Sequence, residues 1–185
     1  MDGRDEAAIA HNLIGMGEDA AVKTRTVESR IVGTRGGASR WNQALNNIFS
    51  RCGKAIDFAH RESTAEGNLY GDGGKEVTDE NRREGRGLDW ISSPELALCL
   101  DLPAWQKYFG FHQNGAYGDM DIQADLDALQ MTWSVRGKTL DVETGRHFQR
   151  DLLGRAAAAL RKPGPFAEPA AEKTTLHIDP RALAR

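Results

Sequence analysis

The sequence has few of the features that mark several large classes of protein. Only two cysteines, Cys52 and Cys99, occur in 185 residues, and their separation fits neither a metal site nor a redox motif. No apolar run approaches the ~18 residues that a membrane-spanning helix requires. The residues after Met1 contain no apolar signal-peptide core. Lysine and arginine are scattered through a chain of net charge −3, which argues against a nucleic-acid-binding surface. We therefore expect neither nucleic acid nor a membrane as partner.

Aromatic residues are also few, at 7%, whereas 20 glycines are present. This balance suits short strands and tight corners better than a helical bundle. Residues 71–87 are too polar to bury, and we expect them to form a long excursion or a lid.

Two stretches of the N-terminal half resemble one another. Asn12-Leu13-Ile14 matches Asn47-Ile48-Phe49 at a separation of 35 residues, and Ala21-Val22 matches Ala55-Ile56 at a separation of 34. Self-similarity at this period indicates repeats that stack on one another. The repeat predicts that Leu13 pairs with Ile48.

A third segment, Asn68-Leu69-Tyr70, begins in the same way. The repeat therefore predicts a ladder of side-chain amides through Asn12, Asn47 and Asn68, which is a known source of stacking stability. The same alignment places Lys23 beside Asp57. That pair could be part of an active site or a plain structural salt bridge.

Residues 15–20 match the loose dinucleotide fingerprint G-x-G-x-x-A. Nucleotide binding would require a helix over Ala20–Arg30, whose N-terminus would hold the pyrophosphate. No acidic residue closes a following strand at Ile31-Val32. We therefore treat nucleotide binding as a weak alternative.

Helical and strand patterns follow in the C-terminal half. Asp101 and Gly110 are suitable caps for a helix whose Leu102, Trp105 and Phe109 share one face. Strands are expected over residues 118–122 and 129–135, and a helix over Thr144–Arg161.

The first of these strands lies in a region rich in aspartate. A solvated strand face explains these residues better than a Ca²⁺ site, which they could also form, and the sequence requires no cofactor. The four residues are Asp119, Asp121, Asp125 and Asp127.

In four segments, the chain resembles the C-terminal portion of right-handed parallel β-helix proteins of the pectate-lyase-like kind. The matching segments are Asn46–Phe58, Ala65–Tyr70, Asp101–Phe111, and Asp151–Arg155 with Pro163–Phe166. The resemblance implies an all-β fold, a right-handed parallel β-helix of few coils, with short C-terminal helices and a strand extension. Residues 1–98 would form the coils, residues 99–166 an extension packed on them, and residues 167–185 a tail.

The resemblance also implies that the first coils are missing and that the natural protein is secreted. A β-helix that began here would expose open strand edges. Upstream coils of a longer chain or a homo-oligomer would then cover the N-terminal edge.

The resemblance implies a polysaccharide or oligosaccharide as partner, with action as a glycoside hydrolase or a polysaccharide lyase. Hydrolysis would need two carboxyl groups, for which Glu18, Asp19 and Asp57 are candidates. Lysis would need a base together with cations that hold the developing negative charge. The alternative is a non-catalytic module that binds glycan or has a structural role, and the active centre could also lie outside this chain.

Candidate site residues follow from these requirements. The candidate catalytic residues are Lys23, Arg25, Asp57, His60 and Arg61. The candidate substrate-binding residues are Asp19, Arg35, Arg40, Trp41 and Glu62. Arginine offers two parallel donors to a carboxylate, and Trp41 offers a flat face to a sugar ring.

Overall fold

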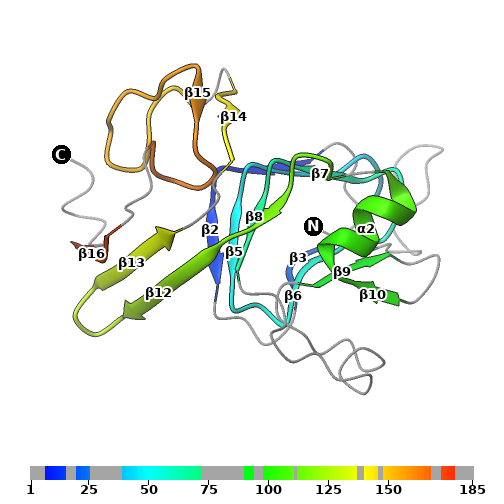
Figure 1. Cartoon of the computed structure of the whole chain (residues 1–185), viewed down its shortest axis with the longest axis horizontal. Helices are drawn as coiled ribbons and strands as arrows, with labels where there is room; N and C mark the ends of the chain where they lie inside the picture. The colour runs from blue at the N-terminus through cyan, green and yellow to red at the C-terminus, as the bar shows by residue number, and fades with distance from the viewer. Residues whose placement is uncertain are drawn as a thin grey trace, which may run out of the picture.

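Short strands dominate the structure. A computed structural model describes residues 7–15, 20–25, 39–71, 90–93, 98–110, 112–136, 140–145, 148–167 and 172–177. The first nine strands are β1 (Ala8–Ala10), β2 (Leu13–Gly15), β3 (Ala20–Lys23), β4 (Gln43–Leu45), β5 (Ile48–Ser50), β6 (Lys54–Asp57), β7 (Thr64–Glu66), β8 (Leu69–Tyr70) and β9 (Trp90–Ser93). They are followed by β10 (Leu98–Leu100), α2 (Leu102–Phe109), β11 (Ala116–Tyr117), β12 (Asp119–Asp125), β13 (Gln130–Arg136), β14 (Val142–Glu143), β15 (Leu160–Arg161) and β16 (Thr174–His177) (Figure 1).

The first nine strands pair across the repeat. In three sheets the orders are β1-β4-β7, β2-β5-β8-β11 and β3-β6-β9-β10, and each pair among the first nine strands is parallel. Leu13 lies opposite Ile48, and Ile48 lies opposite Leu69. The pairing that the repeat predicts between Leu13 and Ile48 is therefore confirmed.

The predicted fold class, a right-handed parallel β-helix, is nevertheless wrong. The described residues form five small separate sheets of two to four strands, in which parallel and antiparallel pairs are mixed. From β10 onward most pairs are antiparallel: β10 with β9, β12 with β13, β13 with β16, and β14 with β15, whereas β11 (Ala116–Tyr117) still pairs parallel with β8. The repeat that suggested coils is confined to short strands in the N-terminal part, because the later sequence alternates as hairpins do.

Three successive sets of strands, β1–β3, β4–β6 and β7–β9, stack as layers, because each strand pairs with its counterpart in the next set. A ladder of asparagine side chains connects these layers, as predicted. The Asn47 Oδ1 accepts hydrogen bonds from the backbone N–H and the side-chain amide of Asn12, at 3.0 and 3.2 Å. The Asn68 Oδ1 accepts the same two bonds from Asn47, at 2.8 and 3.1 Å. The amides of Asn47 and Asn68 also donate to backbone carbonyls of the preceding layer. Because Asn47 and Asn68 are fully buried, these bonds fix the register of the strands.

A left-handed residue precedes each asparagine of the ladder. His11, Asn46 and Gly67 have φ values of 56°, 56° and 64°. Asparagine tolerates this conformation and glycine adopts it without strain. A Cβ on Gly67 would collide with the Asn46 side chain. The space beside Asn46, rather than the conformation alone, therefore favours glycine at this position.

The main core lies between these layers and the helix. Phe49 and Tyr70, both fully buried, stack with ring centroids 5.4 Å apart. The α2 helix closes this core with Leu102 and Trp105. Its predicted caps are confirmed, because the Asp101 carboxylate accepts from the Ala104 N–H at 2.9 Å and Gly110 is left-handed at φ 70°.

A second core lies under the β12–β13 hairpin, which extends from the body on the side away from α2 (Figure 1). Ile122 and Trp133 lie opposite one another across the hairpin, and Trp133 packs on Phe166 with ring centroids 4.5 Å apart. The strands predicted over residues 118–122 and 129–135 are confirmed, the first as the longer Asp119–Asp125 and the second shifted by one residue to Gln130–Arg136.

Two other predicted elements are wrong. The described residues of the segment 144–161 form no helix, because the chain there folds into a turn around the buried Asp151 and ends in β15. Leu152, Leu153 and Leu160 are exposed, so the segment has no apolar stripe that would stabilise a helix on the core. Ala20–Lys23 forms strand β3, so the helix that nucleotide binding requires is absent at its predicted start.

Among the described residues, two histidines are buried. His112 is completely buried, and its Nδ1 lies 3.1 Å from the Tyr70 hydroxyl. Burial lowers the pKa of His112 to about 3. Burial and the nearby Arg161 guanidinium lower the pKa of His11 to about 4, although a backbone hydrogen bond with Gly164 acts in the opposite direction. Both histidines are therefore neutral at neutral pH.

We expect Asn47→Ala to lower the free energy of unfolding by about 1–3 kcal/mol, since it leaves buried polar groups of two neighbouring layers without partners. Urea unfolding measures this change. Asn114→Ala is the matched control, because Asn114 is exposed in a turn, and it should change stability by less than about 0.5 kcal/mol. Equal effects of the two variants would contradict a stabilising role of the ladder.

We expect acid to destabilise the protein through the buried histidines. Their folded-state pKa values lie below the ordinary value of 6.5, so the unfolded chain binds more protons between pH 6.5 and about 3 to 4. The free energy of unfolding should fall as the pH decreases through this window, by up to ~1.4 kcal/mol per pH unit for each histidine. Urea unfolding between pH 7 and pH 5 should show this slope, and His112→Gln should reduce it. An unchanged slope would contradict the assignment.

Candidate functional site

Two segments leave the parallel sheet side by side at the ends of β3 and β6. The Thr24 N–H donates to the Asp57 carbonyl at 3.0 Å, and the Thr24 hydroxyl accepts from the Ala59 N–H at 2.7 Å. Thr24 is buried, so these bonds hold the two chains together where they turn away from the sheet. Arg25 follows Thr24 and His60 follows Ala59, which brings these two side chains to the same corner.

The return into β4 and β7 is fixed in the same way. The Asn42 N–H donates to the Ser63 hydroxyl at 3.2 Å, and the Thr64 N–H donates to the Asn42 carbonyl at 2.9 Å. The Asn42 amide also donates to the buried Ser39 hydroxyl at 3.0 Å, which closes the turn that holds residues 40 and 41. The Ser63 N–H donates to the His60 carbonyl at 3.1 Å, which makes residues 61 and 62 the tip of a tight turn.

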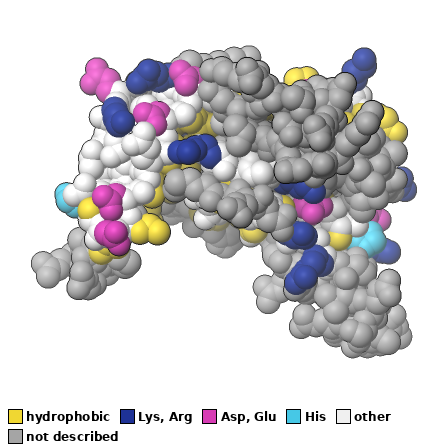
Figure 2. Space-filling model, turned by 90° about the horizontal axis from the view of Figure 1, so that it is seen from below, with side chains coloured by type: hydrophobic (Ala, Val, Ile, Leu, Met, Phe, Trp, Pro, Cys, Tyr) yellow, Lys and Arg dark blue, Asp and Glu magenta, His cyan; other side chains and the backbone are white. Residues whose placement is uncertain are grey.

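These bonds bring together the chain segments that carry eight of the candidate residues, and we call this region the basic corner. Its members are Lys23, Arg25, Arg40, Trp41, Asp57, His60, Arg61 and Glu62. Four are cations and two are carboxylates, whereas the whole chain has a net charge of −3. Figure 2 shows Lys, Arg, carboxylate and His side chains on the face of the molecule that it presents. The corner therefore offers positive charge that the chain as a whole lacks.

Two carboxylates of the corner lie near basic side chains. Lys23 Nζ lies 3.9 Å from the Asp57 carboxylate, and the two residues lie opposite one another in the parallel pair of β3 and β6. The predicted stacking of Lys23 on Asp57 is confirmed. His60 Nδ1 lies 3.9 Å from the Glu62 carboxylate. A carboxylate beside an imidazole can orient it as a proton acceptor.

Trp41 adds a flat surface to the corner. Its backbone is left-handed at φ 53°, and 45% of the residue is exposed. A left-handed conformation is uncommon for a bulky residue, and such residues cluster at functional sites. An exposed indole beside arginines can stack on the apolar face of a sugar ring.

The remaining predicted site residues, Asp19, Arg35 and the hydrolase candidate Glu18, lie outside the described residues. Sequence reasoning missed the residues that build the corner: Thr24, Ser39, Asn42 and Ser63. Part of this set follows the spacing of the sequence repeat. The Ala7 N–H donates to the Asn42 side chain, 35 residues later, and the Asn42 N–H donates to the Ser63 hydroxyl, 21 residues later. These are the same separations that relate the asparagines of the ladder.

The described part of the chain contains no group of three or more His, Cys, Asp or Glu side chains that could hold a metal ion. Of the four aspartates considered for Ca²⁺, three are exposed and Asp121 pairs with Lys173 at 3.4 Å. Within the described residues, no helix has both the length and the apolar character needed to cross a membrane.

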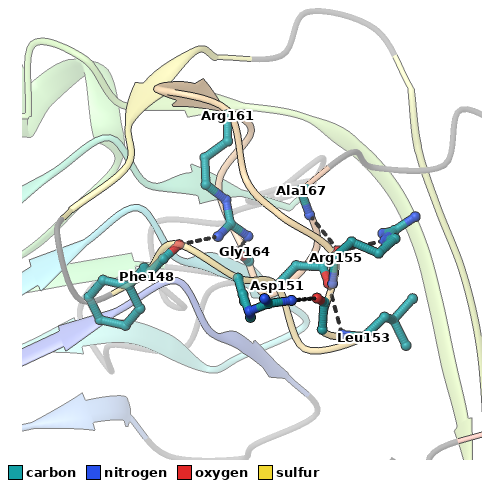
Figure 3. A network of polar contacts seen from close by, with 9 residues as sticks. Phe148, Asp151, Leu153, Arg155, Arg161, Gly164 and Ala167 are labelled. Atoms are coloured by element: carbon teal, nitrogen blue, oxygen red, sulfur yellow. Dashed lines mark hydrogen bonds and ion pairs between the residues drawn. The ribbon is translucent and has the colours of Figure 1, made fainter.

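A second polar network lies in the C-terminal segment, around Asp151 (Figure 3). The Asp151 carboxylate accepts from the N–H groups of Leu153, Arg155 and Ala167 and pairs with the Arg155 guanidinium at 2.7 Å. Burial by itself raises the pKa of this carboxyl. The hydrogen bonds from Ala167 and Arg155 and the positive charge of Arg155 outweigh that effect, so the pKa lies below its usual value.

Arg161 attaches the same segment to the layers. Its guanidinium is buried and donates to the carbonyls of Phe148 and Gly164 (Figure 3). The Gly164 N–H in turn donates to the Asn46 carbonyl at 2.7 Å. The network therefore closes a loop and connects it to the left-handed residue Asn46. Its role is structural.

We expect Asp151→Asn to lower the free energy of unfolding by about 1–3 kcal/mol, because a buried carboxylate that accepts several hydrogen bonds is replaced. Thermal or urea unfolding at pH 7 measures the change. Asp141→Asn is the control, since Asp141 forms an exposed ion pair with Lys162 and should contribute less than about 1 kcal/mol. A larger loss for the control would contradict the structural role of Asp151.

Comparison with known proteins adds no relative: no protein-family model, no curated protein and no solved structure matches this chain. The resemblance to pectate-lyase-like proteins therefore remains a prediction, and any function has to be argued from the basic corner itself.

Proposed function

We propose that this protein binds an acidic polysaccharide at the basic corner. The observation that carries the proposal is the gathering of four cations, an imidazole and an exposed indole at one corner of a chain whose net charge is negative. These side chains come from segments far apart in the sequence, and buried hydrogen bonds of Thr24 and Asn42 hold those segments together. The site is therefore formed before any ligand arrives.

The chemistry of the corner suits a uronate polymer. Each uronate ring carries a carboxylate, which arginine can bind through two parallel hydrogen bonds. Each ring also has an apolar face, against which Trp41 can stack. Neighbouring strands of a sheet lie about 4.8 Å apart, so cations that follow successive strands lie in a row. A row of cations can bind successive carboxylates of one polymer. Secretion belongs to this proposal, because such polymers are extracellular.

Cleavage by β-elimination is the second candidate, and the pairing of His60 with Glu62 favours it over hydrolysis. His60 would take the proton from the carbon beside the uronate carboxyl. The bond from the next carbon to the glycosidic oxygen would break, leaving a double bond in one fragment, and the departing oxygen would take up a proton. Lys23, Arg25 and Arg61 would hold the negative charge that develops on the carboxyl group. Among the described candidates, hydrolysis would use Glu62 and Asp57, and Asp57 already pairs with Lys23 at 3.9 Å.

We expect the chain to bind polygalacturonate but not a neutral glucan, with affinity that falls as salt concentration rises. Arg25→Ala and Arg61→Ala should each weaken binding about 3–10-fold, since one surface charge contact contributes about 1 kcal/mol. Affinity electrophoresis in gels containing either polymer measures this. Lys173→Ala, which removes a cation on another sheet, should bind normally. Equal retardation in both gels, or an equal loss with the control, would contradict the proposal.

Catalysis is tested on the same polymer. If elimination occurs, ultraviolet absorbance of unsaturated ends rises during incubation, and His60→Gln abolishes the rise while binding persists. New reducing ends without absorbance would indicate hydrolysis. Binding without either product identifies a non-catalytic module.

A further inference from the structure

One end of the layered strands remains open to solvent. Among the described residues, β1, β2 and β3 are the terminal strands of their sheets. Ala8, Asn12 and Gly15 are exposed. Ile9 and Ile14 are only partly buried, whereas Ala44 and Phe49, with which they pair in the next layer, are completely buried. The end of the stack therefore presents strand edges around a partly uncovered apolar interior.

The asparagine ladder also ends here. In each inner rung, the side-chain oxygen accepts two hydrogen bonds from the asparagine of the preceding layer. No described residue donates to the Asn12 Oδ1. The side-chain amides of Asn47 and Asn68 donate to backbone carbonyls of the preceding layer. The Asn12 amide instead donates to the Ala10 carbonyl of its own layer at 2.9 Å. Asn12 is thus a rung that lacks its preceding partner.

The backbone repeats this arrangement. The N–H groups of Ile48 and Leu69 each donate, at 2.8 Å, to the carbonyl of the asparagine in the preceding layer. The Leu13 N–H has the same position in the register, and it faces outward from the end of the stack. An incoming strand with an asparagine next to Asn12 would satisfy both the Leu13 N–H and the Asn12 Oδ1.

A second copy of this chain could not extend the ladder beside Asn12. At the opposite end of the ladder, the Ala116 N–H donates to the Asn68 carbonyl at 3.1 Å, so β11 already occupies the position where another copy would continue the ladder. Two free edges that meet around a twofold axis would pair antiparallel, and antiparallel pairing does not reproduce the parallel ladder.

We infer that the edge formed by β1 and β2 binds an extended segment of a partner polypeptide by strand addition. The segment lies parallel to β2 and places an asparagine in register with Asn12. Main-chain hydrogen bonds supply affinity in this mode of recognition, and side chains at fixed positions supply specificity. Here the specificity comes from the amide of the partner's asparagine and from apolar side chains that cover Ile9 and Ile14. This site is separate from the basic corner and does not depend on the proposed function.

The probe is a fluorescently labelled peptide that copies residues 43–50 of this chain, Gln-Ala-Leu-Asn-Asn-Ile-Phe-Ser, because this segment already occupies the equivalent place before β7 and β8. Fluorescence anisotropy against the full-length chain should show saturable binding. A matched peptide with Asn47→Leu should bind about 3–10-fold more weakly, because one or two hydrogen bonds are lost.

Substitutions in the full-length chain identify the edge that binds. Asn12→Leu should weaken binding of the asparagine peptide about tenfold and abolish the difference between the two peptides. Asn12 is exposed, so this variant should keep the far-ultraviolet circular dichroism of the parent chain. Asn114→Leu, at an exposed turn elsewhere, should bind as the parent chain does. No binding at 1 mM peptide, equal binding of both peptides to the parent chain, or no effect of Asn12→Leu would overturn the proposal.

Discussion

The register of the stacked strands depends on buried amide-to-amide hydrogen bonds. Asn47 joins the layers on both sides of it through Asn12 and Asn68, and the buried Asn47 and Asn68 have no water with which to replace these bonds. A shift by one residue would leave several buried polar groups without partners and would turn apolar side chains outward. The ladder therefore determines which residues meet at the basic corner, although it lies at a different turn of the chain.

The C-terminal segment stabilises the layers through buried charge. Arg161 and Asp151 each satisfy backbone groups that would otherwise remain unpaired, and Gly164 connects their loop to Asn46. Removing one partner from such a network is costly, because the remaining charge stays buried. The neutral His11, close to Arg161, belongs to the same balance. Stability of this region therefore depends on pH as well as on packing.

The sequence predicted local features more accurately than architecture. Repeated residues such as Asn12 and Asn47 predicted their own pairing, and the caps of α2 were readable because capping is local in the chain. The overall fold and the segment around Asp151 were not predictable in this way. The overall fold depends on how the later strands pair into sheets, and the segment around Asp151 depends on the burial of single charged residues. Neither of these produces a periodic pattern in the sequence. The eight described candidates meet at one corner, but the buried Thr24 and Asn42 that place them there were missed.

The layers differ in length although their ladder bonds are alike. Asn12 and Asn47 are 35 residues apart, whereas Asn47 and Asn68 are 21 apart. Most of this difference falls between β3 and β4 as compared with β6 and β7, that is, at the turn that carries the basic corner. The fold thus tolerates large changes of length at this turn while the strands remain aligned. Loops of foreign sequence could be grafted there to give the same scaffold new binding specificities.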